Sequence, residues 1–333
     1  MITGSNKFVL SLSIVVLASL LTTSLQASRM YTKIVDDSFA DGDFDATGQG
    51  GELDTPWWTS SSSSGKEISV GSLGLVTGTS GRGIHTIFPA QTLAIHEGVR
   101  ATYTFTTPDS INVGTSSSFT SAFRVGLFDS LGQAGLNANV SASSSNPNPL
   151  YGQGIFVLDP NGDPGPGTVS LPGYMLDMDV YDDPNAPNAS SSDLNYRKHN
   201  SPNTFNGTGR LMATTAQFSS VSPSGPDEGY FWEPNTTYTG SFEIIRINAT
   251  EMRLVGTLGG ATYVNTDVFD SNVISMLGFH VNSRRFGTSN SPDTPDNGID
   301  FSNIMIETSI PEPSSIVLLM GAMITLAGRG RRR

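Results

Sequence analysis

The chain has 333 residues, carries a net charge of −12 and contains no cysteine. The absence of cysteine excludes disulfide bonds, thiol catalysis and thiolate metal sites. A surface this acidic repels the nucleic-acid backbone and anionic membranes, so no nucleic-acid partner is expected. The 36 glycines and 19 prolines, together with the lack of a long helical period, favour many short strands joined by turns.

The N-terminal segment, residues 1–27, has the pattern of a secretory signal peptide. Lys7 is followed by the apolar run Phe8–Leu21, which is shorter than the roughly 20 residues of a comfortable membrane span. The small residue Ala27 marks a suitable cleavage point. The alternative is an N-terminal membrane anchor. We therefore expect an exported protein whose body is a single domain, residues 28–310.

Acidic residues with regular spacing follow near the start of the body. The four residues concerned are Asp41, Asp43, Asp45 and Glu52. They match positions 1, 3, 5 and 12 of an EF-hand loop, whose alternating carboxylates suit calcium. However, Ala46 stands where that loop needs glycine, and the flanks do not resemble helices. The alternative is an acidic turn at the edge of the fold. Calcium is thus the candidate cofactor.

The body predicts a series of strands in which apolar and polar residues alternate. The expected strands are Ile84–Phe88, Val99–Thr106, Ala122–Asp129, Gly154–Leu158, Gly173–Tyr181, Tyr238–Asn248, Glu251–Leu258, Ser275–Val281 and Ile299–Ile306. Residues 248–250 are expected to form a hairpin turn. Two long loops are expected, at 159–172 and from 182 to about 233. The fold class that follows is all-β, a two-sheet antiparallel β-sandwich or jelly roll.

Three aspartates on one expected strand are the best candidates for chemistry. Asp177 and Asp179 share a face of the strand, and Asp182 follows them. Their D-x-D-x-x-D spacing resembles the E-x-D-x-x-E signature of a family of retaining glucanases with a concanavalin A-like jelly roll. Retaining hydrolysis needs two carboxyl groups about 5–5.5 Å apart, and the shorter aspartates would widen that gap. The alternatives are a glycan-binding set, a metal site or a solvated strand face, so no catalytic residue is assigned.

Tryptophans are the other candidates for glycan binding, because sugar rings stack on aromatic side chains. Trp57 and Trp58 are adjacent, and Trp232 ends a short aromatic run. The alternative is that such residues belong to the core. The candidate glycan-binding residues are therefore Trp57, Trp58, Trp232, Asp177 and Asp179.

The C-terminus combines three elements within residues 311–333. The motif Pro311-Glu312-Pro313 is followed by an apolar run at 316–327. That run is short for a stable span. The chain then ends in a basic cluster, which consists of Arg329, Arg331, Arg332 and Arg333. Terminal arginines hold a membrane segment with its end on the cytoplasmic side.

In this order, the three elements resemble the PEP-CTERM sorting signal. The resemblance implies an exosortase, a membrane-bound processing enzyme, as a partner that recognises and cuts the tail near Pro311–Pro313. It also implies transient anchoring in the membrane and delivery to the cell surface or extracellular matrix. The signal is attached to many unrelated domains, so it does not define the activity of the body.

The body itself resembles the concanavalin A-like, or laminin-G-like, sandwiches. The segments that carry this resemblance are residues 37–43 (DSFADGD), 123–128 (FRVGLF), 277–281 (LGFHV) and 299–304 (IDFSNI). Together they extend over nearly the whole body. The resemblance implies the same two-sheet architecture and extracellular polysaccharide as a partner.

We therefore expect an exported, non-catalytic surface or matrix protein with a capacity for glycan binding. The alternative is an extracellular polysaccharide hydrolase or lyase on the same sandwich. It requires Asp177, Asp179 or Asp182 to line a cleft beside a second carboxylate or a Tyr or His base.

Overall fold

The computed structural model describes residues 29–42, 53–59, 67–76, 82–111, 123–132, 171–178, 194–199, 212, 218–222, 232–268, 271–281, 286 and 298–311. The chain divides into two compact units, one formed by 31–309 and the other by 1–30 together with 310–333. No helix in the described ranges is long and apolar enough to cross a membrane. The predicted signal peptide and the apolar run at 316–327 lie outside these ranges.

The described residues form fifteen strands. They are β1 (Arg29–Asp37), β2 (Trp58–Thr59), β3 (Glu67–Ser69), β4 (Ser72–Val76), β5 (Arg82–Thr92), β6 (Gly98–Thr106), β7 (Phe123–Phe128), β8 (Gly173–Met178), β9 (Leu194–His199), β10 (Phe218–Ser220), β11 (Thr237–Arg246), β12 (Glu251–Leu258), β13 (Ala261–Val268), β14 (Val273–Val281) and β15 (Gly298–Pro311).

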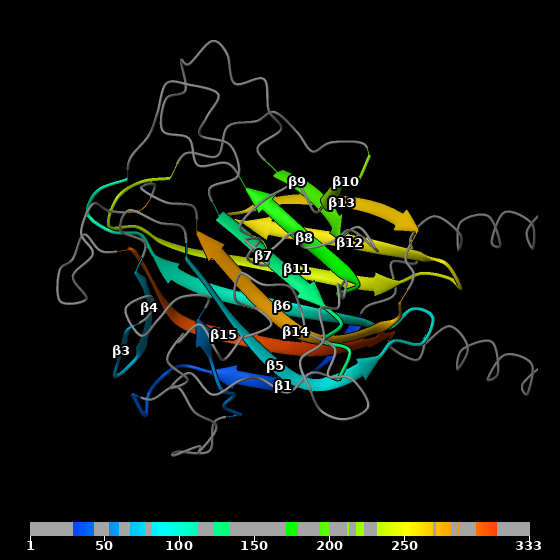
Figure 1. Cartoon of the computed structure of the whole chain (residues 1–333), viewed down its shortest axis with the longest axis horizontal. Coiled ribbons are helices and arrows are strands. Elements are labelled where there is room, and N and C mark those ends of the chain that lie inside the picture. The colour runs from blue at the N-terminus through cyan, green and yellow to red at the C-terminus, as the bar shows by residue number, and fades with distance from the viewer. Residues whose placement is uncertain are drawn as a thin grey trace, which may run out of the picture. The chain divides into compact units, whose positions relative to one another are not determined.

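The strands form two sheets. The eight-stranded sheet has the order β13-β12-β11-β6-β15-β4-β3, with β1 also paired to β15, and the seven-stranded sheet has the order β10-β9-β8-β7-β14-β5-β2. Neighbours along both orders are antiparallel. Figure 1 shows the sheets stacked face to face, with β14, β7 and β8 passing in front of β6 and β11. The predicted all-β, two-sheet antiparallel sandwich is confirmed.

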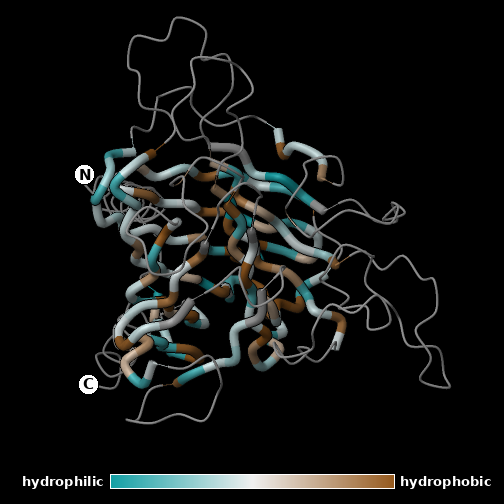
Figure 2. Tube along the Cα trace, turned by 60° about the vertical axis from the view of Figure 1, so that its left-hand side comes forward, coloured by the Kyte–Doolittle hydropathy of each residue, from teal (hydrophilic) through white to brown (hydrophobic). Residues whose placement is uncertain are grey.

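The alternation of side chains along the strands explains this stacking. In β6, Val99, Ala101, Tyr103 and Phe105 are buried, whereas the residues between them are partly exposed. A strand turns successive side chains to opposite faces, so this pattern buries one face of the eight-stranded sheet. Hydrophobic and hydrophilic positions accordingly alternate along the trace in Figure 2. By contrast, β7 and β8 are buried at every position, so both faces of the seven-stranded sheet are covered there.

Aromatic side chains connect the two sheets. Phe105 of β6 lies 5.1 Å from Phe123 of β7, between ring centroids. Phe279 of β14 lies 4.6 Å from Phe301 of β15. Trp232 packs against Phe105 at 5.3 Å. Aromatic pairs at these separations contribute about 0.5–1.5 kcal/mol each beyond the area they bury, so this cluster supplies the cohesion that disulfides provide in many exported domains.

A second contact between the sheets surrounds Tyr196 of β9. Its ring stacks on Tyr263 of β13 at 4.7 Å, and its hydroxyl donates a hydrogen bond of 2.7 Å to the carbonyl of Tyr263. A Cβ atom added to Gly256 of β12 would lie 2.7 Å from Leu176 Cδ2 and 2.9 Å from the Tyr196 hydroxyl. A glycine is therefore needed for the sheets to approach this closely.

The sequence predicted most of the long strands. The strand Glu251–Leu258 has the expected bounds, and the predicted turn at 248–250 joins β11 to β12. In this turn the Asn248 side chain accepts hydrogen bonds of 2.9 Å from the backbone N–H groups of Thr250 and Glu251. The predicted strand Gly154–Leu158 and the predicted loop at 159–172, up to residue 170, lie outside the described residues.

The predicted loop from 182 to 233 is wrong where β9 and β10 lie, and β1, β2, β3, β4 and β13 were not predicted. The short strands β3 and β10 offer too few residues for a period of two to be visible. In β13 the polar residue Asn265 stands at an inward position and interrupts the apolar pattern. Its side chain is buried and donates hydrogen bonds to the Tyr263 hydroxyl and the Val221 carbonyl. Tertiary partners, rather than local pattern, define these strands.

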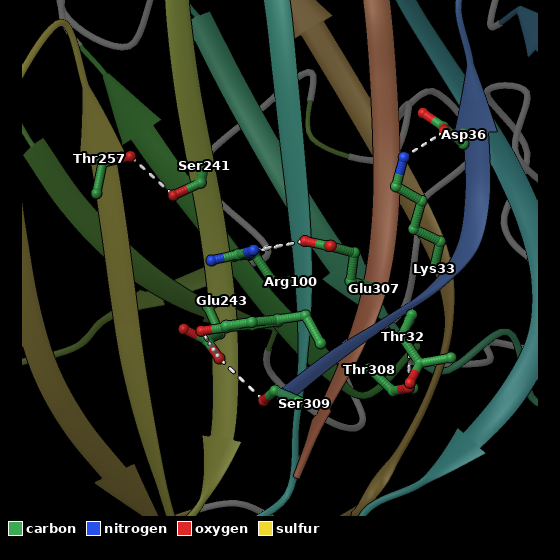
Figure 3. A network of polar contacts seen from close by, with 11 residues as sticks. Thr32, Lys33, Asp36, Arg100, Ser241, Glu243, Thr257, Glu307, Thr308 and Ser309 are labelled. Atoms are coloured by element: carbon green, nitrogen blue, oxygen red, sulfur yellow. Dashed lines mark hydrogen bonds and ion pairs between the residues drawn. The ribbon is translucent and has the colours of Figure 1, made fainter. Parts of the chain in front are cut away.

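A charged network joins four strands on the outer face of the eight-stranded sheet. Arg100 of β6 lies opposite Glu243 of β11 and Glu307 of β15 in the sheet register. It donates to Glu307 Oε2 over 3.0 and 2.6 Å, as Figure 3 shows. Its guanidinium also lies 3.5 Å from the ring centroid of Tyr31, while Ser309 donates to Glu243 over 3.1 Å. The network thereby attaches β1 to β6, β11 and β15.

A buried carboxylate links the end of β1 to Trp57. Asp37 accepts hydrogen bonds of 2.8 Å from Trp57 Nε1 and 2.9 Å from the backbone N–H of Phe39. Burial nevertheless raises the pKa of the Asp37 carboxyl to about 6, with the neighbouring carboxylates of Asp54 and Asp41 adding to the rise. The native state therefore binds a proton at Asp37 more tightly than the unfolded chain does.

Replacing Gly256 by alanine tests the contact between the sheets. We expect Gly256→Ala to lower the free energy of unfolding by about 1–3 kcal/mol, because the added methyl group overpacks the contact with Leu176 and Tyr196. Denaturant unfolding measures the change. Thr257→Ala is the control, since it loses only a partly exposed hydrogen bond to Ser241. Equal losses in the two variants would show that the sheets are not tightly packed at Gly256.

The raised pKa of Asp37 predicts a pH-dependent contribution to stability. The contribution is fully present below about pH 4 and is lost as the pH rises through about 6, because the folded-state pKa exceeds the unfolded value. We expect the stability of the wild type relative to Asp37→Asn to fall by about 1–2 kcal/mol between pH 4 and pH 7, after allowance for solvent screening. Unfolding curves of both proteins across this range measure it, and a constant difference would contradict it.

Candidate functional site

The candidate site lies on the outer face of the seven-stranded sheet, which is turned away from the eight-stranded sheet. Phe123, Val125 and Leu127 of β7 belong to the core between the sheets. Because successive side chains alternate, Arg124 and Gly126 are on the outer face. The same alternation places Met175 and Asp177 of β8 there, opposite the core residues of that strand.

The sheet register places residues of neighbouring strands in rows across this face. One row, from β5 to β8, consists of Gly83, His280, Arg124 and Asp177. The next row, from β5 to β10, consists of His85, Gly278, Gly126, Met175, Arg197 and Ser220. Directly opposite residues are close enough for their side chains to interact. Polar groups that are distant in sequence are thereby collected on one surface.

Asp177 is held by two arginines at the junction of these rows. Its Oδ1 accepts from Arg124 Nε over 2.9 Å, and its Oδ2 accepts from Arg197 Nε over 2.5 Å. The Asp177 and Arg124 side chains are 2% and 4% exposed, whereas that of Arg197 is 19% exposed. A buried carboxylate is tolerated because both of its oxygens have charged donors. The cluster contains two guanidinium groups and one carboxylate.

Met212 covers the centre of the same face. Its carbonyl accepts a hydrogen bond from Arg124 Nη1, and its backbone has a φ of 62°, in the left-handed region. A Cβ atom on Gly126 would lie 2.7 Å from Met212 Sδ, and one on Gly278 would lie 2.6 Å from Met212 Cε. The two glycines, which face each other across β7 and β14, thus form the slot that accepts this side chain.

An apolar cluster surrounds Met212 beside the arginines. Its buried members are Phe128, Leu171, Met175, Met212, Phe218 and Met276. The outer face therefore carries an apolar part, formed by these residues, beside a charged part formed by Arg124, Asp177 and Arg197. The charged part reaches solvent at Arg197 and at Ser220, which is exposed on β10.

The surroundings of Asp177 do not match those that the hydrolase hypothesis requires. A nucleophile or general acid must reach the substrate, but Asp177 is buried with both oxygens bound by guanidinium groups. Asp179 and Asp182 lie outside the described residues. Of the three aspartates, Asp177 alone lies within the described residues, and it forms ion pairs with two arginines.

The structure divides the predicted tryptophans between the core and the register row that contains His85. Trp57 and Trp232 are both buried in the core, so neither presents a ring to a ligand. Trp58 lies in β2, paired with His85. Asp41 lies in the turn after β1, while Asp43, Asp45 and Glu52 are outside the described residues. Within the described ranges, no group of three or more His, Asp or Glu side chains could hold a metal ion.

Of the predicted sorting motif, Pro311 alone lies within the described residues. Pro311 ends β15. Glu312, Pro313 and the four C-terminal arginines lie beyond it, outside the described residues.

Sequence reasoning missed Arg124, Arg197 and Met212 as members of the site. Gly126 and Gly278 offered a signal, because a glycine inside a strand often marks the close approach of another segment. Arg197 offered none, since β9 itself was not predicted.

No family model and no curated protein sequence matches the chain. Solved structures similar to it include a basic winged bean lectin with Tn-antigen, at 10% identity and a TM-score of 0.41, covering 85% of this chain and 100% of the lectin. An endo-1,3-β-glucanase from Streptomyces sioyaensis has 12% identity and a TM-score of 0.35, covering 84% and 96%. Alginate lyase Aly36B has 14% identity and a TM-score of 0.35, also covering 84% and 96%. The chain thus resembles proteins of different activities, and neither a family nor an activity follows from the similarity.

Proposed function

We propose that the protein is an exported, non-catalytic surface or matrix protein that binds glycans on the outer face of its seven-stranded sheet. The observation that carries this proposal is the cluster Arg124–Asp177–Arg197 beside an apolar cluster on one sheet face. Sugars present hydroxyl groups at their edges, and oriented polar groups that reach solvent, such as Arg197 and Ser220, are suited to them. The apolar cluster is buried and lies beside these polar groups.

The rigidity of the arrangement supports binding. The arginines lie on paired strands, and Asp177 fixes both guanidinium groups. A ligand would then lose little binding free energy to ordering of side chains. Arg197 and Ser220 are the members that reach solvent, so they are the expected contact points.

The proposal of export depends on the two ends of the sequence. The segment 1–27 has the pattern of a signal peptide, and 311–333 resembles a PEP-CTERM tail, for which an exosortase is the expected partner. The body would be released from a transient membrane anchor into the surface or matrix, where polysaccharide is available as a ligand.

The alternative of a polysaccharide hydrolase or lyase has less support. Asp177 is occupied by two arginines and is 2% exposed. A second carboxyl group at a catalytic distance is not found on this face among the described residues. The proposal therefore assigns binding without turnover.

A bulky side chain at the exposed end of the face should weaken glycan binding. We expect the purified protein to bind at least one member of a panel of neutral and acidic polysaccharides. We further expect Ser220→Ile to weaken that binding about tenfold or more, because the side chain intrudes beside Arg197. Biolayer interferometry on immobilised glycans measures both.

Ser219→Ile is the matched control, since Ser219 is also exposed on β10 but alternates to the other side of the strand. Equal loss in both variants would place binding elsewhere. The same mixtures are assayed for reducing ends and for unsaturated products. Release of either product at a rate proportional to protein concentration would contradict the non-catalytic assignment.

Processing at both ends should be visible in the mass of the protein. We expect protein recovered from the surface or medium of a producing bacterium to begin at Ser28 and to end near residues 310–313. Intact mass spectrometry with N-terminal sequencing measures this. A recovered mass that includes residues 316–327 would contradict removal of the tail.

A further inference from the structure

We infer that the site selects glycans that carry an oxyanion, a carboxylate or a sulfate, and that Arg197 is the residue that contacts it. The inference rests on the proposed function and names its ligand class. It follows from the charge balance of the cluster, the free donors of Arg197 and the burial of the surrounding groups.

Among the described residues, the cluster has an unbalanced positive charge. Asp177 provides one negative charge for two guanidinium groups, and each of its oxygens is already bound by one of them. Arginine remains protonated under all ordinary conditions. A net charge held at a largely buried position is unfavourable unless a counter-charge is supplied. An anionic group on the ligand would supply it.

The remaining donors belong to Arg197. Its Nε donates to Asp177, and its Nη1 lies 3.3 Å from Ser220 Oγ. Across the described ranges, Nη2 of Arg197 has no acceptor. By contrast, Arg124 donates through Nε to Asp177 and through Nη1 to the Met212 carbonyl. Of these two arginines, only Arg197 is both partly exposed and left with a donor that has no acceptor among the described residues. Arg197 is therefore the group that can contact a ligand.

The geometry favours an oxyanion over a hydroxyl group. A guanidinium presents parallel N–H donors, which match the two oxygens of a carboxylate or sulfate better than a single hydroxyl oxygen. Asp177 acts as a positioning residue, because its bond to Nε fixes the plane in which the Nη donors lie. Met212 covers the neighbouring glycines, so the ligand has access from the side of β9 and β10.

The net charge of the chain is consistent with local recognition. At −12, the protein as a whole repels a polyanion, but this repulsion is screened beyond about 8–10 Å at physiological ionic strength. Contacts at Arg197 are shorter than this distance. Acidic glycans should therefore bind at physiological salt through a localised site, and weakly through the rest of the surface.

The test uses the full chain and three dextrans with the same backbone, which are unmodified, carboxymethylated and sulfated. Alginate and its carboxyl-esterified form provide a second pair. We expect the charged forms to bind at least about tenfold more tightly than their neutral counterparts. Arg197→Gln should remove this preference, whereas Arg197→Lys should keep part of it. The carboxymethyl and sulfate arms distinguish the two sources of the oxyanion.

Arg253→Gln is the matched control, because Arg253 is a partly buried arginine on β12 of the other sheet and its removal changes the net charge equally. An equal loss in Arg197→Gln and Arg253→Gln would overturn the inference, since it would indicate a general charge effect. Binding of neutral glycans alone would also overturn it and leave the proposed function intact. Binding of no glycan would refute the proposed function and the inference together. Melting curves verify that each variant folds. If Arg197→Gln does not fold, the Arg197→Lys variant provides the test, because an unchanged preference for charged glycans would contradict the bidentate contact.

Discussion

The fold depends on aromatic packing between two sheets that no disulfide bond joins. Phe105 and Phe301 of the eight-stranded sheet meet Phe123 and Phe279 of the seven-stranded sheet, and Tyr196 closes the contact near one edge. A domain without cysteine must obtain its stability from a large core. Small residues such as Gly256 are part of the same constraint, because they allow the sheets to approach until the rings touch.

Among the described residues, two charged clusters lie on the outer faces of the sandwich, one with an excess of positive charge and one with an excess of negative charge. On the seven-stranded sheet, Asp177 is shared by two arginines. On the eight-stranded sheet, Arg100 lies between Glu243 and Glu307 in the register. Both clusters carry desolvation costs that only well-formed hydrogen bonds offset. The acidic cluster is completed within the protein by Tyr31 and Ser309, whereas the basic cluster has a partly exposed arginine with an unused donor, which is why it is the better candidate for a ligand.

The apolar part of the candidate face explains why its charged part reaches solvent, within the described ranges, at one side only. Met212 occupies the slot made by two glycines on central strands and accepts a hydrogen bond from Arg124. The centre of the face is therefore filled by the chain itself. Arg197 of β9 and Ser220 of β10 reach solvent, so the edge of the sheet, and not its middle, is where the proposed glycan would bind.

The sequence alone determined the fold class, the long alternating strands and the hairpin at 248–250, because a period of two and turn chemistry are local properties. The lack of cysteine was enough to exclude thiol chemistry. Tertiary structure decided which strands are neighbours, and hence the site: Arg124 and Asp177 are 53 positions apart, and Arg100 and Glu307 are 207 apart. It also decided that Trp57 and Trp232 are core residues and that Asp177 binds arginines. Strand order and register depend on the packing of the whole chain, so no local pattern around these residues could have revealed their partners.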